Sequence, residues 1–203
     1  MKNNNDKPRR GRPASFSREQ ALQTALQLFW QQGYEGTSIA DLVAAMGIAP
    51  PSLYAAFGSK EQLYLEVLDL YLHGPGNFVR VALQETQGAR AFIERILQRA
   101  AEEFTAHQHP PGCIVATGLV TSASLHQGMA QRLRDLRNAT SQAIADRLAQ
   151  GQQAGELPPS CMCADLARFY AAVIQGMSIQ ARDGADQRAL QAIATSALLA
   201  WPQ

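Results

Sequence analysis

Residues 37–60, TSIADLVAAMGIAPPSLYAAFGSK, determine how the whole chain is organised. In the first half of this stretch, apolar residues recur at the spacing of one helix face, at Ile39, Leu42, Val43 and Met46. Gly47 follows at once, where a left-handed residue would end a helix, and Pro50 and Pro51 suit the start of a new one. The stretch therefore predicts two short helices joined by a tight turn.

The second of these helices presents a small, hydroxylated and uncharged face. Leu53 and Phe57 are spaced i, i+4 and pack back on the first helix, which leaves the outward positions to Ser52, Tyr54, Ala55 and Ala56. Such a helix is narrow enough to enter the DNA major groove, where hydroxyls donate to phosphates or base edges. An ordinary pair of core helices is the alternative that this pattern leaves open.

A longer string, GYEGTSIADLVAAMGIAPPSLYAAFGSKEQL at residues 33–63, resembles the DNA-binding domain of the TetR family of transcriptional repressors. The resemblance rests on the elements GYxxTSxxD, SLYxxF and SKExL, in order and at the family's spacing, and it covers about the first third of the chain. It implies an all-α protein with an N-terminal three-helix DNA-binding domain and a C-terminal helical domain for ligand binding and dimerisation.

The same resemblance assigns DNA contacts to particular residues. It implies phosphate contacts from Thr37 and Ser38, DNA contacts from the recognition helix and just beyond it at Ser52, Tyr54 and Lys60, and a turn that needs Gly47. Bulkier residues are usual in the family at Ala55 and Ala56. We therefore expect few direct base contacts and a larger part for DNA shape.

Positive charge is concentrated beside the helix-turn-helix. Residues 1–18 carry six basic side chains against Asp6 alone, although the whole chain has a formal charge of only +1. The segment 1–15 is rich in Pro and Gly, so we expect a disordered arm in which Arg9, Arg10 and Arg12 meet phosphates or enter the minor groove. A solubilising tail is the other interpretation.

Two domains are expected beyond this arm. A helix capped by Ser17 precedes the helix-turn-helix and ends at Gly33, and another runs from Lys60 to the break HGPG at residues 73–76. We place the DNA-binding domain at 16–74 and the C-terminal domain at 75–203. Helical periodicity in the latter predicts helices at 89–107, 113–125, 127–151, 163–180 and from Asp186 onward, with Arg132, Arg134 and Arg137 outward on the third.

The last two predicted helices carry small and apolar residues on one face. Two such helices from each subunit would form a four-helix bundle by two-fold symmetry, as in TetR-like proteins, unless they only complete a monomer core. A single helix-turn-helix reads few base pairs, so a homodimer on a palindromic operator is favoured.

An effector pocket is predicted among large apolar residues of the C-terminal domain, at Phe92, Ile96, Phe104, Leu119, Leu125, Leu136, Phe169, Tyr170 and Met177. TetR-like regulators usually bind a small hydrophobic effector there. Periodicity does not distinguish a pocket from a solid core, and it does not identify the effector.

Three cysteines make an odd count, which argues against a disulfide scaffold and for a reducing cytoplasm. Cys113 opens a predicted helix, where the dipole favours a thiolate and thus a possible sensor, whereas the apolar run behind it favours burial. Cys161 and Cys163 form one C-x-C, which is a weak metal signal without further ligands. No cofactor is expected, and the sequence has no Gly-rich phosphate loop, GxSxG element or paired-carboxylate motif, which argues against an enzyme.

Overall fold

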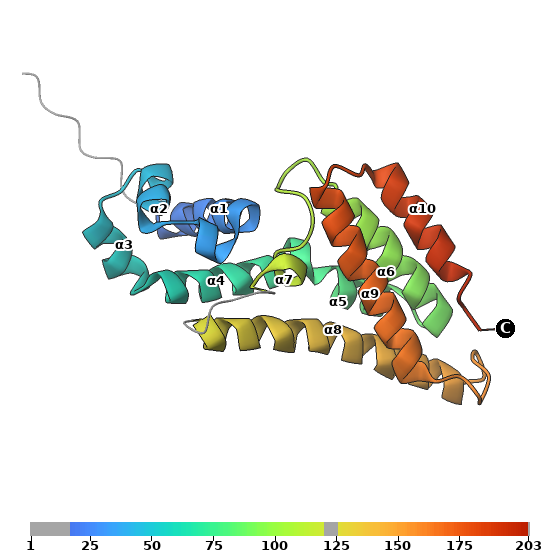
Figure 1. Ribbon diagram of the computed structural model, residues 1–203. Helices are drawn as coiled ribbons and strands as arrows, with labels where there is room; N and C mark the ends of the chain where they lie inside the picture. Colours follow the sequence, from blue (N-terminus) through green and yellow to red (C-terminus); the bar gives the residue numbers. More distant parts are fainter. Residues whose placement is uncertain (1–16, 120–125, 203) are drawn as a thin grey trace, which may run out of the picture.

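The computed structural model describes residues 17–119 and 126–202, and these form helices without any strand (Figure 1). The predicted DNA-contacting residues Arg9, Arg10 and Arg12 lie outside the described residues, as does Leu125. The all-α fold class predicted from the sequence is confirmed for the part of the chain that is described.

The first helix, α1 (Arg18–Gly36), braces the helix-turn-helix. Ser17 caps it by accepting the Gln20 N–H, and its apolar stripe packs on α4. Gly33 takes a left-handed φ of 77° and breaks the helix as predicted, but one more turn follows before Thr37.

The helix-turn-helix consists of α2 (Ile39–Met46) and α3 (Pro50–Phe57), whose axes differ in direction by 95°. Between them Gly47 adopts the left-handed conformation, with φ 66° and ψ 32°. Its backbone N–H donates a hydrogen bond to the end of α2. Leu42, Leu53 and Phe57 are buried, as the spacing predicts, and they join the apolar core under α1. No single described helix is long and apolar enough to cross a membrane, although α2 and α3 together would pass by length and composition as one bent span.

Helix α4 (Lys60–His73) leads from α3 into the C-terminal half (Figure 1). Ser59 caps it through the Gln62 N–H, as predicted. A short 3₁₀ turn, η1 (Pro75–Asn77), and a helix that periodicity missed, α5 (Phe78–Glu85), follow at the predicted boundary. Buried residues on both sides of this boundary belong to one continuous core.

Five further helices form the C-terminal half: α6 (Ala89–Phe104), α7 (Ile114–Thr117), α8 (Gln127–Gln153), α9 (Cys163–Arg182) and α10 (Gln187–Leu198). Helix α9 packs against α6, α8 and α10, so it is central to this half. Asp186 caps α10 through the Ala189 N–H, as predicted.

Two expectations for this half are wrong. Of the helix predicted at 113–125, the described residues 113–119 form only a single helical turn, because Gly118 ends α7 in an extended conformation and Leu119 takes a positive φ of 45°. Arg137 turns inward rather than outward, and its Nη1 donates to the carbonyls of Val115 at 2.8 Å and Gly118 at 3.3 Å. Because α7 ends after one turn, carbonyls at its end are free to accept hydrogen bonds from this guanidinium.

Candidate nucleic-acid interface and apolar cavity

The outward face of α3 carries the predicted recognition residues. Ser52 is exposed and Tyr54 is 48% exposed, although most aromatic side chains of this chain are buried. Ala55 is exposed beside them. Helix α3 lies at one end of the molecule (Figure 1), so a tyrosine hydroxyl with small neighbours on its exposed face can approach a groove closely.

The start of α2 forms the second part of this surface. Ser38 caps α2, because its hydroxyl accepts a hydrogen bond from the Asp41 N–H at 3.1 Å. The Asp41 carboxylate in turn accepts hydrogen bonds from the Ser38 N–H and hydroxyl. These hydrogen bonds from Ser38 lower the pKa of the Asp41 carboxyl. The reciprocal bonds hold the first turn of α2 rigidly and leave Ser38 exposed.

Thr37 does not lie on this surface, so the phosphate contact expected from its side chain needs correction. Its side chain is fully buried, and its hydroxyl donates to the Gly33 carbonyl at 2.8 Å. Because that bond closes the turn between α1 and α2, Thr37 positions the neighbouring Ser38 instead.

Lys60 lies at the start of α4, next to the end of α3. Its ammonium sits 4.2 Å from the centre of the Tyr34 ring, a cation–π contact that fixes the long side chain. Burial lowers its pKa, while Glu35 and Asp41 act in the opposite direction. The amine is therefore held near the recognition helix.

Arg18 is used to hold the helix-turn-helix together. Its guanidinium donates to the Ala56 carbonyl, pairs with Glu66 at 2.7 Å and covers the Phe57 ring. Residues 17–74 contain only two Lys or Arg, against six acidic residues. Since one of these two cations is committed to an ion pair, the helix-turn-helix itself supplies little positive charge.

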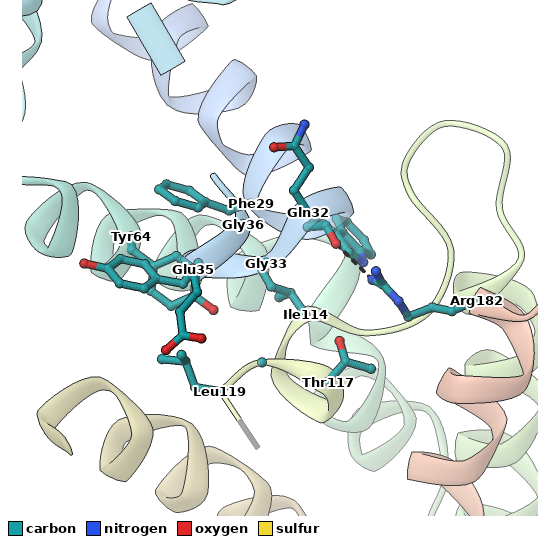
Figure 2. Close-up of a pocket in the computed structure, with 13 residues that line it drawn as sticks. Phe29, Gln32, Gly33, Glu35, Gly36, Tyr64, Ile114, Thr117, Leu119 and Arg182 are labelled. Atoms are coloured by element: carbon teal, nitrogen blue, oxygen red, sulfur yellow. Dashed lines mark hydrogen bonds between the residues drawn. The ribbon is translucent and has the colours of Figure 1, made fainter. Parts of the chain in front are cut away.

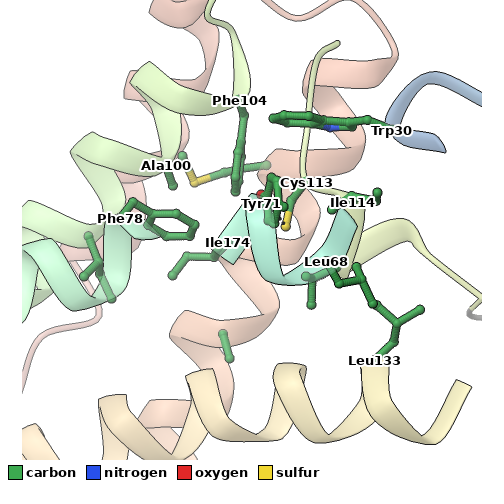
Figure 3. Packing of buried hydrophobic residues seen from close by; sticks show 14 of the residues in the cluster. Trp30, Leu68, Tyr71, Phe78, Ala100, Phe104, Cys113, Ile114, Leu133 and Ile174 are labelled. Atoms are coloured by element: carbon green, nitrogen blue, oxygen red, sulfur yellow. Dashed lines mark hydrogen bonds between the residues drawn. The ribbon is translucent and has the colours of Figure 1, made fainter. Parts of the chain in front are cut away.

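An apolar cavity of about 460 Å³ lies between α4, α5, α8 and α9. Its wall includes Tyr71, Phe78, Leu83, Phe104, Leu136 and Ile174. Figure 3 shows several of these side chains meeting where α4 approaches α6 and α9. A cavity of this volume suits a small organic ligand.

Among the predicted pocket residues that the structure describes, only Phe104 and Leu136 line this cavity. Phe92, Ile96 and Met177 are fully buried in the solid core, and so is Tyr170. Leu119 lines a different crevice, and Phe169 is 40% exposed on the outside of α9. Sequence reasoning missed the walls from α4 and α5, whose Tyr71 and Phe78 are apolar residues flanking the GPG break.

Cys113 is in the cavity wall but is 8% exposed, and the Tyr71 hydroxyl donates to its sulfur at 3.1 Å (Figure 3). Its backbone N–H donates to the Ser178 hydroxyl at 2.8 Å. Burial raises the pKa of this thiol despite the Tyr71 bond. The local environment thus disfavours a reactive thiolate.

Cys161 and Cys163 are free thiols just before and at the start of α9. The pKa of the Cys161 thiol is raised, with burial as the largest cause, followed by the neighbouring Cys163. Within the described part of the chain, no three His, Cys, Asp or Glu side chains gather as metal ligands would.

Arg182 connects the C-terminal half to α1. At the end of α9 its guanidinium donates to the carbonyls of Trp30 and Gln31, each at 3.0 Å, where α1 breaks before Gly33. Figure 2 shows Arg182 directed at this end of α1. The contact borders a crevice of about 330 Å³ that α7 also lines. Since α9 also forms a cavity wall, it touches both the cavity and the brace of the helix-turn-helix.

The outer face of α9 and α10 is apolar. Phe169 is exposed beside a shallow hollow lined by Val173, Ala192, Ile193, Ser196 and Ala197. Small residues around a protruding aromatic side chain fit the close packing of a second pair of helices.

A projecting recognition helix on a braced helix-turn-helix, joined to a helical half with an apolar cavity, defines a helix-turn-helix transcriptional regulator. The chain belongs to the TetR family: residues 21–67 match the family model of bacterial regulatory proteins, tetR family, and residues 87–197 match the tetracyclin repressor-like C-terminal domain. The predicted family membership is therefore confirmed.

Curated relatives and solved structures agree with this assignment. The chain is 37% identical to the HTH-type transcriptional repressor ComR of Escherichia coli over 97% of this chain and 94% of that one. It is 31% identical to the repressor BdcR of Escherichia coli over 86% and 83% of the two chains. A cysteine mutant of the TetR family regulator CifR, complexed with 26-bp double-strand operator DNA, matches with a TM-score of 0.88 and 38% identity over 95% of this chain and 100% of that one.

Proposed function

We propose that this chain is a cytoplasmic homodimeric repressor that binds a palindromic operator through α3 and leaves it when a small ligand fills the cavity. The exposed face of α3, with Ser52 and Tyr54, carries the DNA-binding part of this proposal. The operator complex of CifR supports it, because that regulator matches this chain over nearly its whole length. We propose action by binding alone, without catalysis.

The proposed DNA contacts rest on the family resemblance, and the exposure of this surface supports them. Tyr54 and Ser52 enter the groove, Lys60 meets a phosphate beside it, and Ser38 binds a phosphate at the start of α2. Because the body of the domain is poor in cations, the arm with Arg9, Arg10 and Arg12 supplies most of the charge neutralisation. Gly47 maintains the turn that sets α3 against α2.

Two recognition helices are needed to give a useful specificity. In the proposed dimer α9 and α10 of each subunit pack around Phe169, and two-fold symmetry places the two α3 helices in successive major grooves, roughly 34 Å apart.

Ligand release is a competition between two conformations. Helix α4 has Lys60 at one end and the cavity residues Tyr71 and His73 at the other, and α9 joins the cavity wall to α1 through Arg182. A ligand that occupies the cavity favours the conformation whose recognition helices no longer match the grooves. A thiol switch at Cys113 is the second candidate, and the raised pKa of that thiol speaks against it.

The test is to sequence genomic DNA fragments retained by the purified protein, alongside the variants Phe169→Glu and Met162→Glu. We expect the wild type and Met162→Glu, which changes an exposed residue outside the bundle helices, to enrich one palindromic site with two chains bound. Phe169→Glu should be monomeric and lose the enrichment. Retention without any shared sequence, or one chain per site, would refute the proposal.

A further inference from the structure

The cavity combines apolar walls with charged side chains of one sign, which is positive. Its lining includes Arg137, Arg80 and His73 but no Asp or Glu among the described residues. His73 and Arg80 are exposed, with Arg80 bound to Asn77, so they mark the side open to solvent. Arg137 is the half-buried cation of the wall.

Arg137 is held in place without a counter-ion. Its Nη1 donates to the Val115 and Gly118 carbonyls, and among described residues no carboxylate lies within ion-pair distance. Partial burial lowers the pKa of its guanidinium, and nearby Arg134 acts in the same direction. A half-buried, uncompensated cation favours an anionic partner.

Two other arginines that donate to backbone carbonyls show what a purely structural role looks like here. Arg147, also on α8, donates through both Nη atoms to three carbonyls around the end of α5. Arg182 likewise uses both Nη atoms on the end of α1. Arg137 has donor capacity left, because within the described chain its Nη2 and Nε bond to no acceptor, and it alone of the three lines the cavity.

We infer that the effector is an amphipathic carboxylate, whose head group pairs with Arg137 and whose apolar body occupies the space between Phe78, Phe104, Leu136 and Ile174. The planar guanidinium fork matches a carboxylate in two parallel hydrogen bonds. Thr140, one helical turn along α8, and Gln175 on α9 are further polar residues of the lining. This inference rests on the proposed effector role of the cavity and specifies its ligand class.

The experiment compares ligands that differ only in their head group. Calorimetric titration of the DNA-free protein with octanoate, 1-octanol and octylammonium should give affinities in that order, with octanoate at least tenfold tighter than the alcohol. Hexanoate should bind about 15-fold more weakly than octanoate, because each buried methylene contributes ~0.8 kcal/mol.

Three variants identify the cation. Arg137→Gln should reduce the preference for octanoate over 1-octanol below threefold, whereas Arg137→Lys should keep part of it. Arg134→Gln removes an exposed cation one turn earlier on α8 and should behave as wild type. Should Arg137→Gln fail to fold, the lysine variant and the wild-type head-group series decide the question.

Several outcomes would overturn the inference: no binding of octanoate, equal binding of 1-octanol by wild type, or a preference that survives in folded Arg137→Gln. Failure of the proposed function looks different. If octanoate binds through Arg137 but leaves operator DNA in place, ligand-released repression is wrong while the assignment of the head group stands.

Discussion

The two ends of α4 lie in contrasting surroundings. At its start, capped helices, the Gly47 turn and the Arg18 bonds fix the backbone tightly, while Ser52 and Tyr54 of α3 face solvent. At its end, Tyr71 is buried, but it borders a cavity and adjoins α7, which is only one turn long. One end is built to present a fixed surface, whereas the other leaves room for a ligand and for rearrangement.

The largest expected effect separates the solid core from the cavity wall. Ile96→Ala removes a fully buried side chain and should lower the free energy of unfolding by about 2–5 kcal/mol. Leu136→Ala, on the cavity wall, should cost about 1 kcal/mol because the site is only half-buried and borders existing space. Chemical denaturation measures both, and equal losses would refute this division.

Ile96 and Leu136 also show how much of the structure could be predicted from the sequence alone. The helices and the turn of the helix-turn-helix were predictable, because caps, left-handed glycines and i, i+4 spacing are local signals, as at Ser38 and Gly47. The cavity was not, since Ile96 and Leu136 look alike in a periodic pattern and differ only in what long-range packing places against them.

Two local details needed the structure as well. The burial of Thr37 follows from a bond back to Gly33, and the inward turn of Arg137 follows from the unravelled end of α7. Neither partner is determined by helical periodicity.

Deleting part of the basic arm tests how much of the phosphate neutralisation the arm provides. Deleting residues 1–12 removes five basic side chains, so the slope of log affinity against log salt should become shallower by about 0.9 for each phosphate that the arm no longer neutralises. Melting temperature serves as the control and should stay constant. An unchanged slope would make this segment a solubilising tail.

The turn of the helix-turn-helix should show a smaller effect. Gly47→Ala forces a residue with a side chain into the left-handed region and should destabilise the protein by about 1 kcal/mol. Gly36→Ala is the matched control, since Gly36 lacks a positive φ and an added Cβ makes only ordinary contacts. If thermal denaturation shows the two variants to be equally stable, the turn does not depend on Gly47.

The smallest effect concerns acid stability at the surface of the C-terminal half. Hydrogen bonds from Arg99 and Arg95 lower the pKa of the Glu85 carboxyl to about 2, from 4.5. Because the folded pKa is the lower one, this contribution is complete above pH 4.5 and disappears as the pH falls towards 2. Glu85→Gln should thus narrow its stability gap to wild type across this range, and a constant gap would contradict the assignment.

The most direct test of the DNA-binding surface is an operator titration of Tyr54→Ala and Lys60→Ala. Arg90→Ala is the control, since it removes an exposed cation from α6, in the half of the molecule remote from α3 (Figure 1). We expect at least a tenfold loss of operator affinity in each of the first two variants, unchanged affinity in the control, and melting temperatures close to wild type in all three. Wild-type affinity in both Tyr54→Ala and Lys60→Ala would contradict the role assigned to this end of the molecule.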